Sequence, residues 1–118
     1  MLTAEQLAFR KKWVAALRSG KYKQTHSFLH RRRSFCCLGV MCDLKDSGRW
    51  RSYDFGLIAY GNETSHPPAD VLATYGFAND DALQLAYMND GVEGFTRHTF
   101  AEIADTIELL TLADMETP

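Results

Sequence analysis

The 118-residue chain lacks any long apolar run, and no stretch approaches the roughly 20 apolar residues that span a bilayer. We therefore expect no membrane segment. The chain also lacks a disulfide framework, because its three cysteines fall within seven residues and two of them are adjacent. The N-terminal residues form a charged amphipathic pattern where a signal peptide has an apolar core. These features predict a location in the cytoplasm, which is a reducing compartment.

Motifs of common chemistries are missing as well, including the glycine-rich phosphate loops and the G-x-S-x-G turn of hydrolases. Cys37 and Cys42 are spaced more widely than in a usual zinc knuckle, and no cysteine pair follows His26 and His30. The acidic residues of segment 80–93 are explained as a helix cap and turn residues. We therefore predict no metal site and no cofactor, and the sequence leaves any catalytic residue unknown.

Basic residues are almost absent from the second half of the chain. Residues 1–51 carry 12 of the 13 lysines and arginines against three acidic residues, whereas residues 52–118 carry 12 acidic residues and Arg97 alone. One interpretation is a basic face for nucleic acid or an acidic partner. The other is that the two halves face each other and partly neutralise, or that their charges are simply solvated, and we favour this second interpretation.

The densest apolar run, Ser34–Leu44, contains all three cysteines. Its apolar residues cover a wider arc than a surface helix shows, so we predict a helix after Cys36 that is buried on most sides and ends at Gly48. Gly39 lowers the helical propensity by about 1 kcal/mol relative to alanine. A glycine at this position indicates that another backbone passes close to the helix.

The whole sequence is typical of a single α+β domain over residues 1–118. We predict that this domain is mainly helical and has a small β element near 50–60. The first predicted helix, 3–19, has Thr3 as its cap and places Arg10 and its basic neighbours on the solvent side. Further predicted helices are a short one after Pro68, one at 81–88 capped by residues 79–80, and one at 100–112 capped by Thr99; the tail 113–118 is expected to fray.

Two segments are candidates for function. Cys36 or Cys37 could be the nucleophile of a cysteine-dependent enzyme, because both lie near a helix N-terminus after three arginines, which favours a thiolate. We favour buried structural cysteines, since no signature of a cysteine hydrolase is present. Arg31, Arg32 and Arg33 are the candidate contact site, because the planar guanidinium group donates paired hydrogen bonds to phosphates and carboxylates.

The chain resembles a group of small bacteriophage and prophage proteins. The shared residues are a Trp13…Ala-Leu-x-Ser-Gly-x-Tyr22 pattern, the run Phe35-Cys-Cys-Leu-Gly-Val-x-Cys-Asp43 and matching positions in the last helix. The resemblance implies a phage accessory protein in the bacterial cytoplasm but carries no known activity or site residues. We therefore expect a binding protein that contacts a host protein or protein complex, in a counter-defence role. Two alternatives stay open: nucleic-acid binding by the basic half of the chain, and a cysteine-dependent enzyme that uses Cys36 or Cys37.

Overall fold

The computed structural model describes residues 2–92, 94 and 96–116. Helices predominate in this part of the chain and two small sheets accompany them, which confirms the α+β prediction. The elements are α1 (Ala4–Arg18), β1 (Lys23–Gln24), β2 (His30–Arg31), β3 (Ser34–Phe35), α2 (Cys37–Lys45), a 3-10 turn (Ser47–Arg49), β4 (Trp50–Ser52), β5 (Ile58–Tyr60), α3 (Ala69–Thr74), α4 (Asn79–Asp90) and α5 (Phe100–Glu116).

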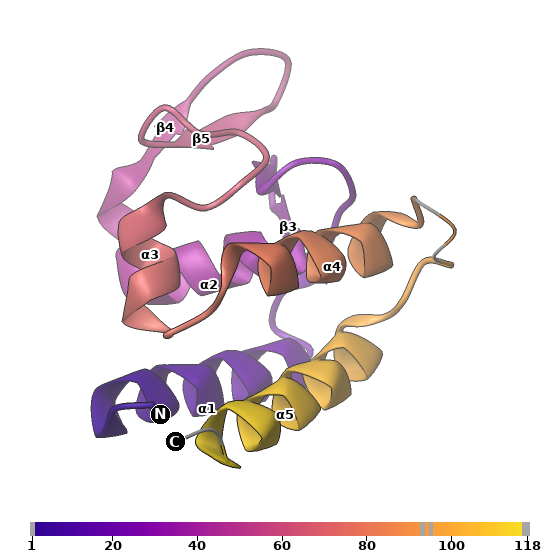
Figure 1. The fold of residues 1–118 in the computed structure, drawn as a ribbon. Helices are drawn as coiled ribbons and strands as arrows, with labels where there is room; N and C mark the ends of the chain where they lie inside the picture. The colour runs from indigo at the N-terminus through magenta and orange to yellow at the C-terminus, as the bar shows by residue number, and fades with distance from the viewer. Residues whose placement is uncertain (1, 93, 95, 117–118) are drawn as a thin grey trace.

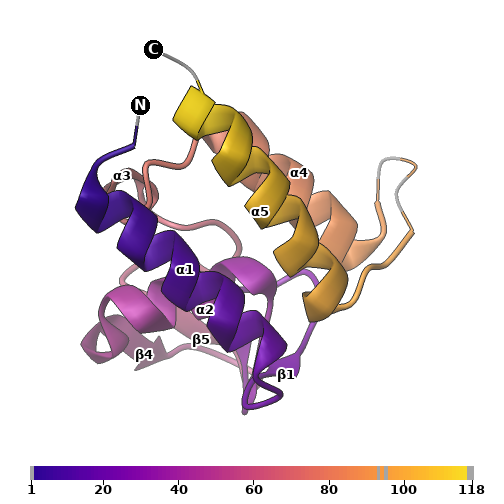
Figure 2. The same cartoon turned by 90° about the horizontal axis from the view of Figure 1, so that it is seen from below.

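The helices form two layers, and the strands lie on the far side of the second layer. Helices α1 and α5 lie side by side and run in opposite directions, so that the two chain termini are neighbours (Figures 1 and 2). Helices α2, α3 and α4 pack above them, and the strands follow at the opposite end of the molecule from α1 and α5 (Figure 1). None of the helices in the described residues is long and apolar enough to cross a bilayer.

Helix α2 is the central element that the sequence predicted. It packs against α1, α3 and α4, and every residue from Cys37 to Cys42 is buried. The helix ends at Lys45 instead of Gly48, because Asp46 leaves the helical conformation at φ −164°. The Asp46 carboxylate then accepts a hydrogen bond from the Gly48 N–H at 3.0 Å, and this bond caps the start of the following 3-10 turn.

Gly39 lies against the backbone of Leu29, as the sequence predicted. A methyl group on Gly39 would lie 1.9 Å from the Leu29 carbonyl oxygen, far inside van der Waals contact. That oxygen also accepts a hydrogen bond from the Cys36 N–H, and the Leu29 N–H donates to the Thr64 carbonyl. The close approach therefore fixes the chain immediately before β2 on the surface of the central helix.

The predicted capping boxes are present at α1 and α5. The Thr3 and Gln6 side chains each accept a hydrogen bond from the other's backbone N–H, and Thr99 and Glu102 repeat this arrangement. Besides the end of α2, two boundaries were predicted wrongly. Helix α4 already begins at Asn79 and has no side-chain cap, and α5 continues through residues 113–116, where fraying was expected. Residues 93, 117 and 118 lie outside the described part.

Arg10 was predicted on the solvent side of α1 but is 1% exposed. Its guanidinium group donates hydrogen bonds to the carbonyl oxygens of Tyr75 and Gly76 at 2.7 and 2.6 Å, just after α3. It also forms an ion pair with Asp114 of α5 at 2.9 Å. These partners satisfy the buried charge, so that one side chain joins α1, α3 and α5.

Candidate basic and aromatic surface

The predicted contact residues lie in a tight hairpin. Strand β3 pairs with β2 antiparallel, with Arg31 opposite Ser34, and with β1 parallel. Arg32 and Arg33 form the two-residue turn between β2 and β3, and Arg32 has a left-handed backbone with φ 55°. All three arginine side chains, Arg31, Arg32 and Arg33, are exposed. We call this segment the arginine hairpin.

Packed aromatic rings support the base of the arginine hairpin. The imidazole of His30 stacks on Phe35 with ring centroids 3.8 Å apart, and Trp50 meets His30 edge-on at 4.8 Å. His30 Nδ1 lies 2.9 Å from the Ser34 carbonyl oxygen, which can only accept, so Nδ1 carries the proton. Asp43 of α2 accepts a hydrogen bond from the Trp50 indole N–H at 3.0 Å. The hairpin is therefore fixed to the core at its base while its turn faces solvent.

Asn89, the last-but-one residue of α4, holds the neighbouring strand β1. The sequence assigned it to a turn, but it is fully buried. Its amide oxygen accepts hydrogen bonds from the Gln24 side chain at 2.9 Å and from the Cys37 N–H at 3.3 Å. Its amide nitrogen donates to the Thr25 carbonyl oxygen. Since Asn89 fixes the backbone around Gln24 and Thr25, it also fixes Lys23 beside the arginine hairpin.

A second hairpin, β4–β5, joins the first at its tip. The Arg32 N–H donates to the Gly56 carbonyl oxygen at 2.8 Å, and Arg31 forms an isolated β-bridge with Leu57. The loop is closed internally, because the Tyr53 N–H donates to the Leu57 carbonyl and the Leu57 N–H donates to the Asp54 carbonyl. The sequence predicted this hairpin near 50–60, but it did not predict that the two loops meet.

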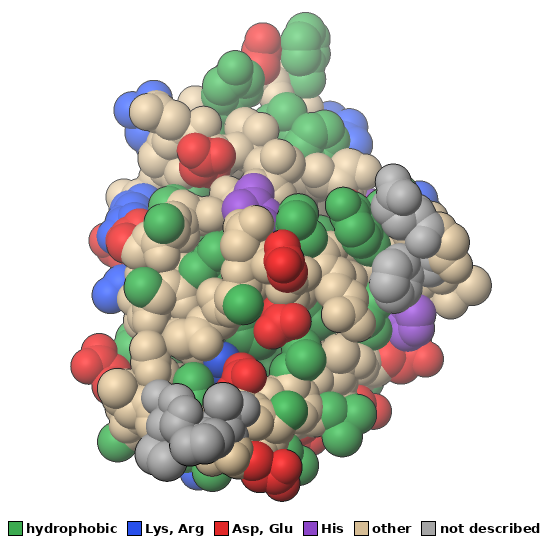
Figure 3. Space-filling view, viewed as in Figure 1, with side chains coloured by type: hydrophobic (Ala, Val, Ile, Leu, Met, Phe, Trp, Pro, Cys, Tyr) green, Lys and Arg blue, Asp and Glu red, His purple; other side chains and the backbone are tan. Residues whose placement is uncertain are grey.

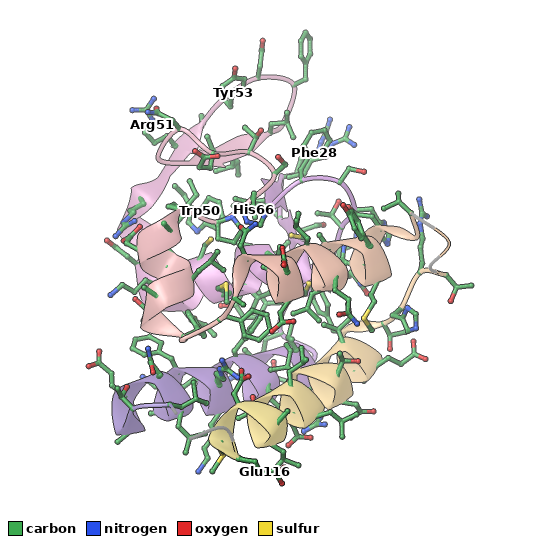
Figure 4. All side chains as sticks on the ribbon, in the orientation of Figure 1. Phe28, Trp50, Arg51, Tyr53, His66 and Glu116 are labelled. Atoms are coloured by element: carbon green, nitrogen blue, oxygen red, sulfur yellow. The ribbon has the colours of Figure 1, made fainter. Side chains whose placement is uncertain are left out.

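The tip of the second hairpin presents two aromatic side chains to solvent. Tyr53 is 66% exposed and Phe55 is 87% exposed, and Phe55 has a left-handed backbone with φ 49°. Tyr53 lies at the outer end of the molecule, with Arg51 beside it (Figure 4). In the space-filling view, two groups of apolar side chains stand at this tip with an acidic side chain between them, and basic side chains lie on both flanks below it (Figure 3).

Sequence reasoning placed Tyr53 and Phe55 in strands and missed their exposure. Asp54 and Gly56, on either side of Phe55, were a signal for a turn, because both residue types are frequent in turns. We define the basic–aromatic surface by seven residues from the two hairpins and β1: Lys23, Arg31, Arg32, Arg33, Arg51, Tyr53 and Phe55.

The cations of this surface differ in their ion pairing from the other arginines of residues 1–51. Arg10, Arg18 and Arg49 all form ion pairs with acidic residues of the second half, so the two halves neutralise each other in part. Within the described residues, by contrast, the five cations of the basic–aromatic surface form no ion pair. Four of them, Lys23 and the three hairpin arginines, line a hollow of about 720 Å³ together with Thr25 and Ser34. Positive charge without an ion-pair partner is therefore concentrated in this hollow.

A second hollow, of about 970 Å³, runs between α1 and α5. It is mainly apolar and includes Leu109, Leu112 and Met115, which are exposed. Arg18 at its rim is paired with Asp105 and Glu108 at 2.6 Å each, whereas Lys11 forms no ion pair with the described residues. This groove therefore holds one unpaired cation, against four in the hollow of the arginine hairpin.

The structure places the cysteines in the core, as the favoured interpretation predicted. Cys36, Cys37 and Cys42 are all buried and unpaired by disulfides. Cys36 caps α2, because its sulfur accepts a hydrogen bond from the Gly39 N–H at 3.3 Å. A nucleophile requires a lowered thiol pKa, but burial raises the pKa of Cys36 to about 12 and raises that of Cys37 as well. This environment argues against the cysteine-dependent enzyme.

Comparisons with known proteins identify a family and no activity. No curated protein and no solved structure matches the chain. A family model described as "Domain of unknown function (DUF8296)" matches residues 6–111, which include α2, α3 and α4, most of α1 and α5, both hairpins and the basic–aromatic surface. Because the match covers most of the chain, the protein belongs to the DUF8296 family.

Proposed function

We propose that the protein acts as a non-enzymatic binding protein, and that it contacts a polyanionic host macromolecule through the arginine hairpin. The observation that carries the proposal is the hollow formed by Lys23, Arg31, Arg32 and Arg33, whose cations form no ion pair with the described residues. Bringing several like charges together without carboxylate partners opposes folding through their mutual repulsion. An anionic partner would remove this repulsion and gain charge-assisted hydrogen bonds.

The cellular context of the proposal comes from the sequence alone. The resemblance to phage and prophage proteins supports a role in the bacterial cytoplasm during infection, with a counter-defence role as one form of it. The geometry favours a polyanion over an apolar protein surface, because four cations that form no ion pair with the described residues gather in the hollow of the arginine hairpin, whereas the groove beside α5 contains one such cation. Burial of the three thiols supports binding over cysteine-dependent catalysis.

Salt-dependent retention on a heparin column tests the proposal. The test variant is Arg31→Ala with Arg33→Ala; Arg32 is kept, because its side chain packs along Gly56. The matched control, Lys11→Ala with Lys12→Ala, removes the same charge from exposed positions on α1. We expect the wild type and the control to elute at similar salt, and the arginine variant to elute much earlier. Equal elution of both variants would contradict the proposal.

A further inference from the structure

We propose that the ligand of the basic–aromatic surface is a single-stranded nucleic acid, with its phosphates in the arginine hollow and unpaired bases stacked on Tyr53 and Phe55. This inference rests on the proposed function for the phosphate contacts and adds the aromatic contacts. Proteins that bind single strands combine a positively charged groove along the backbone with aromatic rings under successive bases. The two hairpins bring both features together from segments 20 residues or more apart in the chain.

The aromatic tip contributes little to the packing of the fold. Phe55 is 87% exposed and is not part of the hydrophobic core, although Leu57 next to it is half-buried. Its backbone lies in the left-handed region at φ 49°, which is unfavourable for a bulky residue and natural for glycine. A strained conformation that holds an apolar ring in water points to a role outside folding.

The phosphate hollow and the aromatic tip meet where Arg32 contacts Gly56, the residue after Phe55. The Arg32 side chain runs along Gly56, where a methyl group on Gly56 would lie 3.0 Å from the guanidinium Nε. Gly56 follows Phe55 in sequence, and the carbonyl oxygen of Gly56 accepts a hydrogen bond from the Arg32 N–H. One strand could therefore contact the Arg32 guanidinium group with a phosphate and the Phe55 ring with the adjoining base.

The chemistry of the tip favours a single strand over two other polyanions. Paired bases in a duplex already stack on each other, so their faces are closed to Phe55 and Tyr53. An acidic protein could satisfy the arginines, but its carboxylates offer no flat face to the rings. Asp54, between the two rings, repels phosphates; it would keep the strand's backbone over the arginines and leave the bases at the tip.

Fluorescence anisotropy with a labelled oligothymidine of about 12 nucleotides tests the inference, since this length lies within the roughly 4–16 nucleotides that an OB-fold domain covers on a single strand. The test variant is Tyr53→Ala with Phe55→Ala. The matched control is Leu109→Ala with Leu112→Ala, which removes two exposed apolar side chains from α5. We expect the tip variant to lose at least about tenfold in affinity, given the usual contribution of base stacking, and the control to bind as the wild type does.

Two further ligands and one further variant separate stacking from charge and from misfolding. An abasic strand of the same length should bind the wild type and the tip variant equally, and a duplex should bind more weakly than the single strand. Tyr53→Ala with Phe55→Gly should lose affinity equally, and because glycine suits the backbone at position 55 it should fold at least as stably.

The outcomes distinguish this inference from the proposed function. A tip variant that binds oligothymidine as tightly as the wild type, or a duplex that binds as tightly as the single strand, would overturn the inference. Either result leaves the heparin prediction intact, because heparin carries no bases. Failure of the heparin prediction would instead remove the arginine hairpin as the site of charge recognition, whatever the tip contributes.

Discussion

Replacing Gly39 with alanine tests how the central helix supports the arginine hairpin. The new methyl group would lie 1.9 Å from the Leu29 carbonyl oxygen and 2.8 Å from the carbonyl carbon. Relief requires a backbone shift of more than about 1 Å, since atoms of this kind rest at roughly 3.5 Å. Such a shift would break the hydrogen bonds that join Leu29 to Cys36 and Thr64.

The expected destabilisation follows from three terms. Alanine gains about 1 kcal/mol of helical propensity over glycine. Overpacking a close-packed interior costs about 1–3 kcal/mol, and here backbone atoms must move. Two backbone hydrogen bonds contribute about 1 kcal/mol each. Gly39→Ala should therefore lower the free energy of unfolding by about 3 kcal/mol, which corresponds to a fall in Tm of about 10 °C.

Urea denaturation followed by circular dichroism measures this effect. Gly48→Ala is the matched control, because its methyl group would meet only the carboxylate of Asp46, an exposed residue, at 3.2 Å. The control should stay within about 0.5 kcal/mol of the wild type. If Gly39→Ala were as stable as the wild type, or more stable, the backbone of Leu29 could not lie against α2, and the support of the arginine hairpin would be refuted.

Three further predictions concern the core and the ion pairs. The three thiols should resist iodoacetamide at neutral pH until the protein unfolds, since burial raises the pKa of Cys36 to about 12; rapid labelling of the native protein would contradict this. Arg10→Met should lower the free energy of unfolding by about 2–4 kcal/mol through its lost buried partners, whereas Lys11→Met should change it by less than about 0.5 kcal/mol in the same urea titration. Hydrogen bonds donated by arginines lower the pKa values of Asp70 and Glu108 in the folded protein. The two carboxylates therefore stabilise the fold fully above their unfolded pKa values near 4, and this stabilisation is lost as the pH falls through the lower folded pKa values. The urea midpoint should fall between about pH 5 and pH 3, and a constant midpoint would refute this prediction.

Local patterns were enough to predict the helices and the central scaffold. The apolar arc around Cys37 and the glycine within it predicted a buried helix crossed by another backbone, and the structure confirms both. Thr3 and Thr99 marked the starts of α1 and α5, because a capping box depends only on residues three apart. Where no such box exists, at the start of α4, the predicted boundary was wrong.

Long-range partners explain what the sequence could not predict. Arg10 was placed in solvent because a helical pattern assigns charge to the outer face, and its carbonyl partners lie 65 residues or more away. The exposure of Phe55 was missed for a related reason, since an aromatic residue near a strand is usually buried. The arginines Arg31–Arg33 were predicted to be a contact site, but the sequence could not show that they form no ion pair with the described residues, because this depends on where the acidic residues of the second half fold.

The central claim is that the basic–aromatic surface binds an extended anionic strand. Titration of ¹⁵N-labelled protein with oligothymidine, followed by amide chemical shifts, locates the contact most directly. The account predicts shifts confined to segments 23–35 and 51–57, with α1 and α5 unchanged. Shifts concentrated instead along the groove between α1 and α5, with the two hairpins unaffected, would contradict it.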